Sequence, residues 1–267
     1  MNNMIVCIKG AGEMATAVAW RLYMANIREI IMLESPRPLA VRRKVSFCEA
    51  VFDGTQTVEN VSADFCHDVE GVHGIWQESK IAVTVDPTWH MLKQIKAGVV
   101  VDAILAKKNL GTTISDARLV VGLGPGFIAG QDVHMVVETN RGHNLGRIIE
   151  SGSAEPNTGI PGSIGGYSEE RVLRAPADGL FCTTRRIGDK VKKGDVLGTV
   201  QNRKISANVG GVVRGLLRSN SQVHLGLKIG DIDPRGEENY CHMISDKARA
   251  SAGSVLEAVL REFPPVG

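Results

Sequence analysis

The sequence predicts an α/β plus β chain: an N-terminal α/β domain, a central glycine-rich β segment, a β sandwich and a C-terminal helix. Three observations predict this order. Apolar strand patterns alternate with helical patterns over the first 115 residues. A stretch rich in glycine and proline then replaces the alternation. Finally, a set of glycine and valine positions recurs at a constant spacing, which is typical of two similar halves in one β domain.

The N-terminal segment predicts a β-α-β unit with a glycine-rich turn. An apolar strand from Met4 to Ile8 enters a Gly-x-Gly-x-x-Ala turn, and a helix and a second buried strand, Ile30 to Leu33, follow. Gly10 permits the tight turn, Gly12 leaves room for a phosphate beside the backbone, and Ala15 allows close packing of helix and strand. This pattern favours a Rossmann-like nucleotide-binding domain, although the glycines could also serve packing alone.

Charged residues near this unit are candidate cofactor contacts. Glu34 follows Gly12 by about 20 residues, where an acidic residue contacts a ribose. Arg42 and Arg43 come later and could bind a second phosphate, or they could lie on a solvated helix face. Glu13 belongs to the candidate site by position, but its carboxylate would satisfy the helix dipole and repel a pyrophosphate unless it points away.

Two further strands, 80–86 and 98–102, complete the predicted Rossmann-like domain of residues 1–115. Asp102 ends the last strand, so it could line a ligand crevice at the carboxyl edge of the sheet or cap a short helix. Residues 39–52 are expected to be largely helical and residues 66–74 to form a loop. The Cys and His spacing in that loop matches no familiar metal site, so no metal ligands are predicted.

Residues 116–168 form the predicted glycine-rich β segment and connector. Gly124 and Gly126 follow an apolar strand and are candidate cofactor contacts. Two strands joined by a tight turn come next and concentrate polar side chains. These side chains are candidates for the reactive end of a ligand site, with Arg141 as a cofactor contact and three catalytic candidates: Asp132, His134 and His143. The alternative is a surface hairpin with solvated charges.

Residues 169–236 carry the internal repeat, in which four positions of the first half recur in the second. The recurring positions are Gly179, Val191, Gly194 and Gly198, matched by Gly211, Val223, Gly226 and Gly230. Two such halves predict a flattened β sandwich of the biotinyl/lipoyl-like kind. Lys204 lies on the hairpin between the halves but lacks the neighbours that modifying enzymes read, so a module without the carrier lysine motif is expected. Residues 237–267 predict a C-terminal helix that packs back on a core.

Composition limits the classes of partner and compartment. The chain has 267 residues, 43% of them hydrophobic and 22% charged, which is enough for a sizeable core. A net charge of +2 argues against a dedicated nucleic-acid surface. No apolar run reaches membrane-spanning length and no signal peptide is recognised. The five cysteines form no Cys-x-x-Cys pair, which favours a reducing, cytoplasmic location. A homo-oligomer is possible.

Short motifs along most of the chain resemble the YqeB family, accessory proteins of selenium-dependent molybdenum hydroxylase systems. The matching segments include Ile8–Thr16, Arg42–Arg43, Phe47–Val51, Val101–Ala103, Val121–Phe127, Asp132–His134, Glu138–Thr139, Arg141–His143, Asn157–Gly159, Ala175–Gly179 and Lys228–Arg235. The resemblance implies a role in the maturation of a molybdenum hydroxylase client. It identifies no catalytic residue.

The sequence therefore predicts a maturation factor that binds NAD(P) or a molybdopterin dinucleotide. The glycine-rich turn would hold phosphate, Glu34 a ribose, and Arg42 or Arg43 a second phosphate. Two alternatives stay open. One is an NAD-dependent oxidoreductase, against which the absence of a Tyr-x-x-x-Lys pair counts. The other is a non-catalytic docking or sensing protein for the hydroxylase. Whether the chain catalyses a reaction is left open.

Overall fold

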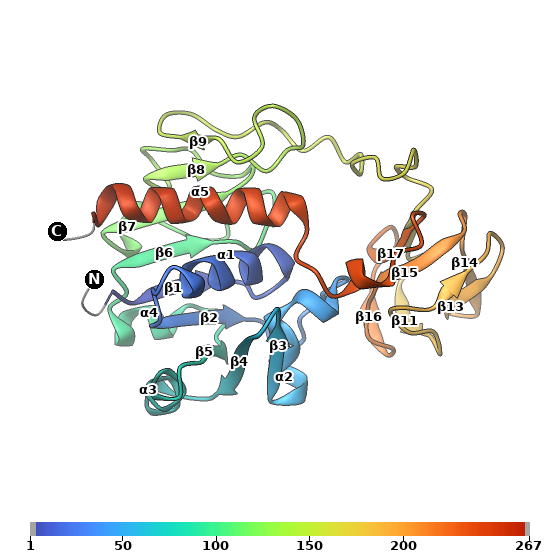
Figure 1. Ribbon diagram of the computed structural model, residues 1–267, viewed down its shortest axis with the longest axis horizontal. Coiled ribbons are helices and arrows are strands. Elements are labelled where there is room, and N and C mark those ends of the chain that lie inside the picture. The colour runs from blue at the N-terminus through green and yellow to red at the C-terminus, as the bar shows by residue number, and fades with distance from the viewer. Residues whose placement is uncertain (1–3, 265–267) are drawn as a thin grey trace. The chain divides into compact units, whose positions relative to one another are not determined.

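The structure is a computed structural model that describes residues 4–264 (Figure 1). The chain divides into two compact units. Of the described residues, unit 1 contains 4–38, 46–157 and 244–264, and unit 2 contains 39–45 and 158–243. Within the described residues, no helix combines the length and apolar character needed to cross a membrane.

A mixed sheet forms the centre of unit 1. Its strands are β1 Val6–Lys9, β2 Ile30–Glu34, β3 Thr55–Val58, β4 Val61–Cys66, β5 Ile81–Val85, β6 Val99–Asp102, β7 Leu119–Leu123, β8 Met135–Val137 and β9 Ile148–Ile149. The order is β3-β4-β5-β2-β1-β6-β7-β8-β9. The seven inner strands of this order, β4, β5, β2, β1, β6, β7 and β8, are parallel to one another. The edge strands β3 and β9 run antiparallel to their neighbours. The central strands are continuous apolar runs because both faces of the sheet are covered.

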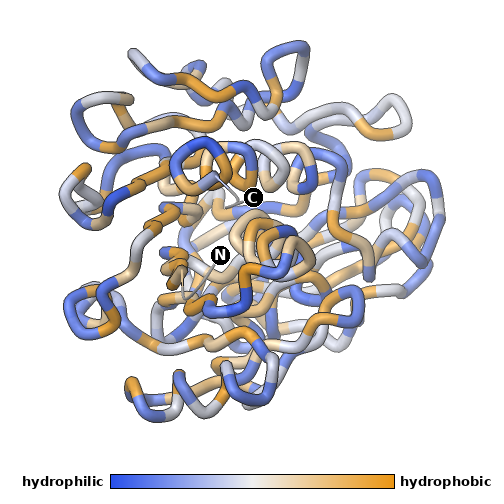
Figure 2. Tube along the Cα trace, turned by 60° about the vertical axis from the view of Figure 1, so that its left-hand side comes forward, coloured by the Kyte–Doolittle hydropathy of each residue, from blue (hydrophilic) through white to orange (hydrophobic). Residues whose placement is uncertain are grey.

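Helices cover both faces of this sheet. On one face α1 (Glu13–Met24) packs beside α5 (Asp246–Glu262), and α5 also contacts β7 and β8 (Figure 1). On the other face α3 (Val69–Gln77) and α4 (His90–Ile95) pack on a cluster of buried side chains from the strands. Hydrophobic stretches of the trace lie mainly in its interior, and hydrophilic stretches lie mainly on the outer turns (Figure 2).

Unit 2 consists of two four-stranded antiparallel sheets around their own core. Its strands are β10 Val172–Arg174, β11 Gly179–Cys182, β12 Lys190–Val191, β13 Val196–Val200, β14 Arg203–Ser206, β15 Gly211–Leu216, β16 Ser221–Val223 and β17 Lys228–Asp233. One sheet has the order β10-β17-β15-β12 and the other β14-β13-β11-β16. Phe181, Val213 and Leu216 are completely buried between them.

The sheet of unit 1 corrects the predicted Rossmann-like class. The sheet does not end near residue 115, because β7, β8 and β9 of the predicted glycine-rich segment extend it. A Rossmann-like fold joins neighbouring parallel strands through helices. Here only a single 3₁₀ turn, Ile114–Asp116, lies between β6 and β7, and a loop joins β7 to β8. Helix α5 covers these strands instead, from the far end of the sequence.

Two local predictions also fail, for different reasons. Residues 39–52 form 3₁₀ turns and a four-residue helix, α2 (Ala50–Asp53), instead of one long helix. Tertiary bonds compete with helical ones there, since Phe47 donates its N–H to Thr16 Oγ1 at 2.8 Å. The predicted loop at 66–74 contains α3, which begins after Asp68; the Asp68 carboxylate caps it by accepting the Gly71 N–H at 2.8 Å.

Candidate functional site

The backbone of the glycine-rich turn after β1 is hydrogen-bonded to other residues of the same chain. Glu34 Oε2 accepts the N–H of Ala11 at 2.9 Å, and Glu34 Oε1 accepts the N–H of Ser35 at 2.7 Å. The carbonyl oxygen of Ala11 accepts the N–H of Cys48 at 2.9 Å. The carboxylate predicted to hold a ribose therefore binds the turn itself. A pyrophosphate at this corner would have to displace or avoid a negative charge, so the corner does not favour the predicted dinucleotide.

Three of the four other candidate residues at this turn, Gly10, Glu13 and Ala15, also have roles within the fold, whereas packing around Gly12 does not require a glycine. Gly10 has φ 90°, and a Cβ there would lie 3.3 Å from Ile104 Cα, so the glycine serves the turn and its packing. Gly12 has open space around it. Glu13 Oε1 accepts the N–H of Ser245 at 3.2 Å, which directs its carboxylate toward the start of α5. Ala15 is fully buried, as expected from the close approach of α1 and the sheet.

The predicted second phosphate site lies in another unit. Arg42 and Arg43 belong to unit 2, where both guanidinium groups bind carbonyl oxygens. Arg42 Nη2 donates to Tyr240 O and Met243 O, each at 2.8 Å, and Arg43 Nε donates to Leu216 O at 2.7 Å. These bonds fasten residues 39–45 to the rest of unit 2. They give both arginines a role within unit 2, and the predicted phosphate contact stays untested.

Asp102 belongs to a buried network that fixes the loop after β6. Its Oδ2 accepts from Thr112 Oγ1 at 2.6 Å, and its Oδ1 accepts the N–H of Ile104 at 3.2 Å. Lys9, which is fully buried, donates to Thr112 Oγ1 at 2.9 Å and to Asp116 Oδ2 at 2.7 Å. Burial raises the pKa of Asp102, although the bonds from Thr112 and Ile104 oppose it. The network stabilises the loop and leaves Asp102 no open approach to a ligand.

Two of the three catalytic candidates hold the backbone. Asp132 Oδ2 accepts the N–H of Ile128 at 2.8 Å and closes a turn. His134 Nδ1 accepts the N–H of Val120 at 3.0 Å, so the proton of the neutral ring lies on Nε2. His143 is exposed. Within the described residues no hydrogen bond or ion pair joins the three side chains, and no group of three or more His, Cys, Asp or Glu there could hold a metal ion.

The remaining cofactor candidates are explained by packing and by an ion pair. A Cβ at Gly124 would lie 2.6 Å from Thr139 Oγ1, and one at Gly126 would lie 2.7 Å from the backbone nitrogen of Lys108. Both glycines therefore permit close approach of neighbouring chain. Arg141 makes a bidentate pair with Asp246, with N–O distances of 2.8 and 2.9 Å, at the start of α5.

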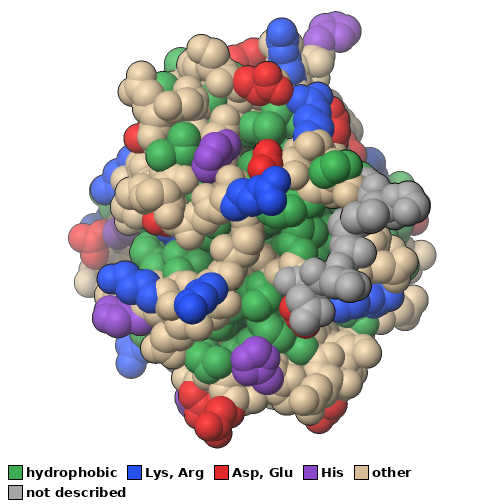
Figure 3. Space-filling view, turned by 90° about the vertical axis from the view of Figure 1, so that its left-hand side faces the viewer, with side chains coloured by type: hydrophobic (Ala, Val, Ile, Leu, Met, Phe, Trp, Pro, Cys, Tyr) green, Lys and Arg blue, Asp and Glu red, His purple; other side chains and the backbone are tan. Residues whose placement is uncertain are grey.

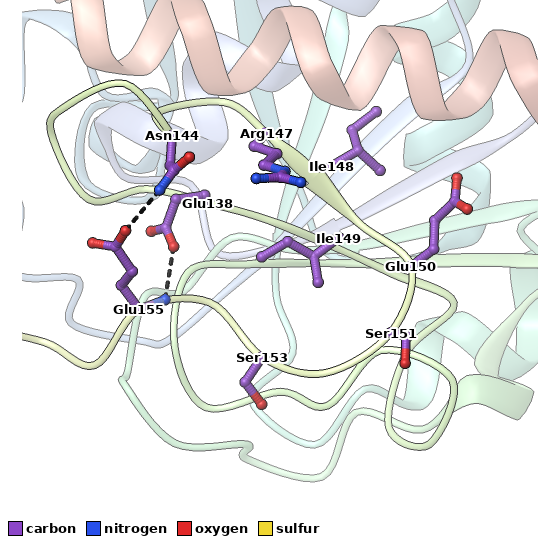
Figure 4. Close-up of a pocket in the computed structure, with 9 residues that line it drawn as sticks. All are labelled: Glu138, Asn144, Arg147, Ile148, Ile149, Glu150, Ser151, Ser153 and Glu155. Atoms are coloured by element: carbon purple, nitrogen blue, oxygen red, sulfur yellow. Dashed lines mark hydrogen bonds between the residues drawn. The ribbon is translucent and has the colours of Figure 1, made fainter.

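A pocket of about 330 Å³ lies beside β9 and extends from Glu138, at the carboxyl end of β8, to the loop that follows β9 (Figure 4). Its lining comes from the end of β8 and the loop and strand that follow: Glu138, Asn144, Arg147, Ile148, Ile149, Glu150, Ser151, Ser153 and Glu155. The Glu138 side chain is buried, with 2% of the residue exposed. Its Oε1 accepts the N–H of Asn140 at 2.6 Å and its Oε2 that of Glu155 at 2.7 Å, which joins the two ends of the loop.

The pocket is lined by a carboxylate held in place by hydrogen bonds, Glu155, and by a guanidinium group, Arg147. The Glu155 carboxylate accepts from Asn140 Nδ2 at 2.6 Å and from Asn144 Nδ2 at 3.0 Å, and these bonds hold the pKa of Glu155 below its ordinary value (Figure 4). Arg147 also lines the pocket, and no hydrogen bond or ion pair within the described part of the chain engages its guanidinium group. The arrangement can bind a ligand that carries both an acidic group and a donor.

Lys247 is a charged neighbour of this region that the sequence analysis missed. Burial and the nearby Arg141 lower the pKa of Lys247, while Glu13 and Glu138 oppose that shift. A lysine in the first turn of α5 also lies at the positive end of the helix dipole, where a cation is disfavoured. A lysine at the start of a predicted helix was therefore the sequence feature that could have identified Lys247. For Arg147 and Glu155 no comparable signal exists, because only the folded loop brings them together.

Charge is more evenly spread at the opposite edge of the sheet. Figure 3 shows the side on which the central strands begin. In that view hydrophobic side chains appear between scattered basic, acidic and histidine side chains, and no one kind of charge gathers there. The candidate site of unit 1 is therefore taken as the pocket lined by Glu138, Arg147 and Glu155.

Comparisons with solved structures return weak likenesses. One is an aspartoacylase family protein from Mesorhizobium loti, with 12% identity, a TM-score of 0.26 and coverage of 86% of this chain and 85% of that one. Another is the ectoine utilization protein EutE from Ruegeria pomeroyi, with 12% identity, a TM-score of 0.24 and coverage of 79% and 60%. At these TM-scores no reaction or substrate is carried over to the present chain.

The comparisons with solved structures leave several predictions without support. The solved structures found in these comparisons give no support to Rossmann-like or biotinyl/lipoyl-like domains. None of them supports a maturation factor for a selenium-dependent molybdenum hydroxylase, a docking protein for that enzyme or an NAD-dependent oxidoreductase. The Glu34 carboxylate accepts the N–H of Ala11 in the glycine-rich turn, and this negative charge disfavours a nucleotide phosphate there. NAD(P) or a molybdopterin dinucleotide as cofactor stays an untested prediction.

A comparison with curated proteins gives a stronger match, whereas no family model matches the chain. The uncharacterized protein YqeB of Escherichia coli (strain K12) is 48% identical over 259 residues, which is 97% of this chain and 48% of that protein. The chain thus spans about half the length of the curated relative it matches. Over nearly its whole length, the chain is therefore similar to about half of the YqeB protein.

Proposed function

We propose that unit 1 binds a small amino or hydroxy acid in the pocket beside β9. One observation carries the proposal. The pocket contains a carboxylate, Glu155, that two asparagine amides hold in place, and a guanidinium group, Arg147, that is not engaged elsewhere in the described residues. A pocket of about 330 Å³ suits a ligand of this size.

Each lining residue has a role in this proposal. Arg147 binds the carboxylate of the ligand, because a guanidinium group matches a carboxylate with two parallel N–H donors. Glu155 accepts a hydrogen bond from the amino or hydroxyl group. Glu138 acts as a positioning residue, since its bonds to Asn140 and Glu155 hold the loop in place. Ser151 and Ser153 add hydroxyl groups to the lining.

The proposal concerns binding and assigns no reaction. A nucleophilic mechanism needs a nucleophile and a base within hydrogen-bond reach of each other. Among the described lining residues no such bond joins Ser151 or Ser153 to a carboxylate.

The test is a binding screen with free amino acids and small hydroxy acids, read by thermal shift and then by calorimetry. Arg147→Gln should weaken binding of any hit by roughly ten- to a hundredfold, the equivalent of one lost charge-assisted contact. Arg37→Gln is the matched control, because Arg37 is an exposed arginine of unit 1 outside the pocket. Equal binding by the wild type and Arg147→Gln would refute the assignment.

A further inference from the structure

Unit 2 contains a second pocket, separate from the site proposed for unit 1. It has a volume of about 450 Å³ and lies beside the sheet of β14, β13, β11 and β16. Its polar lining includes Cys182, Thr184, Arg185 and Thr199, and Val196 supplies an apolar wall. A pocket of this volume is large enough for a small ligand.

A row of three side chains crosses the outer face of this sheet. Strand β11 pairs with β13 so that Cys182 lies opposite Thr199, and β13 pairs with β14 so that Thr199 lies opposite Lys204. Directly opposite residues share a face of the sheet, with Cβ atoms about 5 Å apart. Phe181 and Val200, the preceding and following residues in these strands, are fully buried in the core. The thiol, the hydroxyl and the ammonium group therefore share the outer surface.

The charge of this pocket is positive. Arg185 Nε donates to Val196 O at 3.3 Å, which holds the guanidinium group at the pocket wall. Within residues 4–264, no other hydrogen bond or ion pair engages the side chain of Arg185, and none engages that of Lys204. The described lining includes no Asp or Glu. The pocket in unit 1, by contrast, is lined by Glu138, Glu150 and Glu155.

We propose that the pocket of unit 2 binds a small anion through an oxyanion group, a phosphate or a carboxylate. Arg185 contributes two terminal nitrogens in the fork that fits such a group. Thr184 and Thr199 contribute hydroxyl donors, and Lys204 adds positive charge along the same face. Val196 contacts the aliphatic part of the ligand. The proposal is independent of the amino- or hydroxy-acid site, because it uses other residues in another unit.

The rate at which the Cys182 thiol is labelled can report on anion binding in this pocket. It is the exposed cysteine, and the other four cysteines are buried, so iodoacetamide should label Cys182 first. The labelling rate is followed by peptide mass spectrometry in inorganic phosphate, in succinate, and in chloride at matched ionic strength. Saturable protection by phosphate or succinate supports the proposal and tells the two oxyanions apart. Labelling at the chloride rate in both overturns it.

Two neighbouring arginines provide matched variants. Arg185→Gln should raise the anion concentration needed for protection by about tenfold or more. Arg186→Gln should leave it unchanged, because Arg186 is exposed and lies outside the pocket lining. An equal loss in both variants would overturn the proposal. If Arg185→Gln does not fold, amide chemical shifts of the wild type decide. Phosphate- or succinate-induced shifts at Thr183–Arg185 and Gly198–Thr199 support the site, and shifts confined to other residues overturn it.

Discussion

Lys247 shows how a single residue can be placed against its own electrostatic preference. Burial and Arg141 disfavour its charged form and lower its pKa, and the dipole of α5 acts in the same direction. A side chain held in such surroundings is often retained for function. Glu13 and Glu138 oppose this shift, and Glu138 also lines the proposed pocket.

Lys247→Met should therefore raise the thermal midpoint of unfolding, because it removes a charge that the folded state disfavours. The sign follows from the lowered pKa. The unfavourable contribution is present while Lys247 is protonated and disappears as pH rises through its folded pKa. The gain should shrink at alkaline pH, as measured by calorimetry from neutral to alkaline buffer. A lower midpoint for Lys247→Met at neutral pH would contradict this account.

At the scale of single residues, the sequence predicted the backbone conformation at Gly10 but not the hydrogen-bond partners of side chains such as Glu34. The Gly10 turn was predicted, and Gly10 has the positive φ that the turn requires. The partner of Glu34 was not predicted, because the same spacing lets its carboxylate bind either a ribose or the N–H of Ala11. Likewise, the contact between Glu155 and Asn144 depends on a loop conformation that no periodic pattern encodes.

At the scale of elements, α5 and the loop before β9 are held together by a close contact. Ser254 Oγ donates to the carbonyl oxygen of Gly146, whose φ is 82°. A Cβ at Gly146 would lie 3.0 Å from that Oγ. By contrast, Gly253 lies inside α5 with nothing within 4 Å of an added Cβ.

These two glycines should respond oppositely to alanine. Gly146→Ala should lower the free energy of unfolding by about 1–3 kcal/mol, since it combines a left-handed φ with crowding against α5. Gly253→Ala should raise it by about 0.5–1 kcal/mol, because alanine loses less entropy on entering a helix. Urea titrations of both variants measure the two changes. The same sign for both would contradict the packing of α5 described above.

Elements with a strong apolar pattern were predicted from sequence, and those set by tertiary contacts were not. The strands β1, β2, β5 and β6 lie where buried apolar runs indicated them. Helix α3 was missed because Gly71 and Gly74 suggest a loop. Gly71 is required inside the helix, since a Cβ there would lie 2.9 Å from Cys66 Cβ.

At the scale of the whole molecule, the sequence indicated that the alternation of strands and helices ends near residue 115. It did not indicate that the same sheet continues beyond that residue. The strands β7 and β8 lack crossover helices of their own, so the βα alternation that marks such sheets stops while the sheet does not. Their cover, α5, comes from the other end of the chain. Local patterns cannot report a contact between segments so distant in sequence.

A buried ion cluster makes the molecule sensitive to acid. Asp231 is completely buried in unit 2 and binds Arg171 and Arg214. Burial alone would raise the pKa of Asp231, but Lys228, Arg214 and Arg171 together hold it below its ordinary value. The carboxylate therefore contributes stability fully above the unfolded value of about 3.9, and the contribution is lost as pH falls through the lower folded pKa.

Asp231→Asn should destabilise unit 2 by about 3–5 kcal/mol near neutral pH, because it leaves buried guanidinium groups without a compensating charge. The difference from the wild type should shrink once pH falls below about 4. Chemical denaturation across this pH range, followed by a probe placed in unit 2, measures both effects. A variant as stable as the wild type at neutral pH would show that the cluster does not stabilise unit 2.

The most direct test of the central claim is amide chemical-shift mapping of the full chain with the amino or hydroxy acid that binds best. We expect saturable shifts centred on Asn144, Arg147, Ser151, Ser153 and Glu155, which Arg147→Gln abolishes at the same ligand concentration. Shifts centred on Gly10 to Gly12 instead, or no saturable shifts with any acid of the panel, would contradict it.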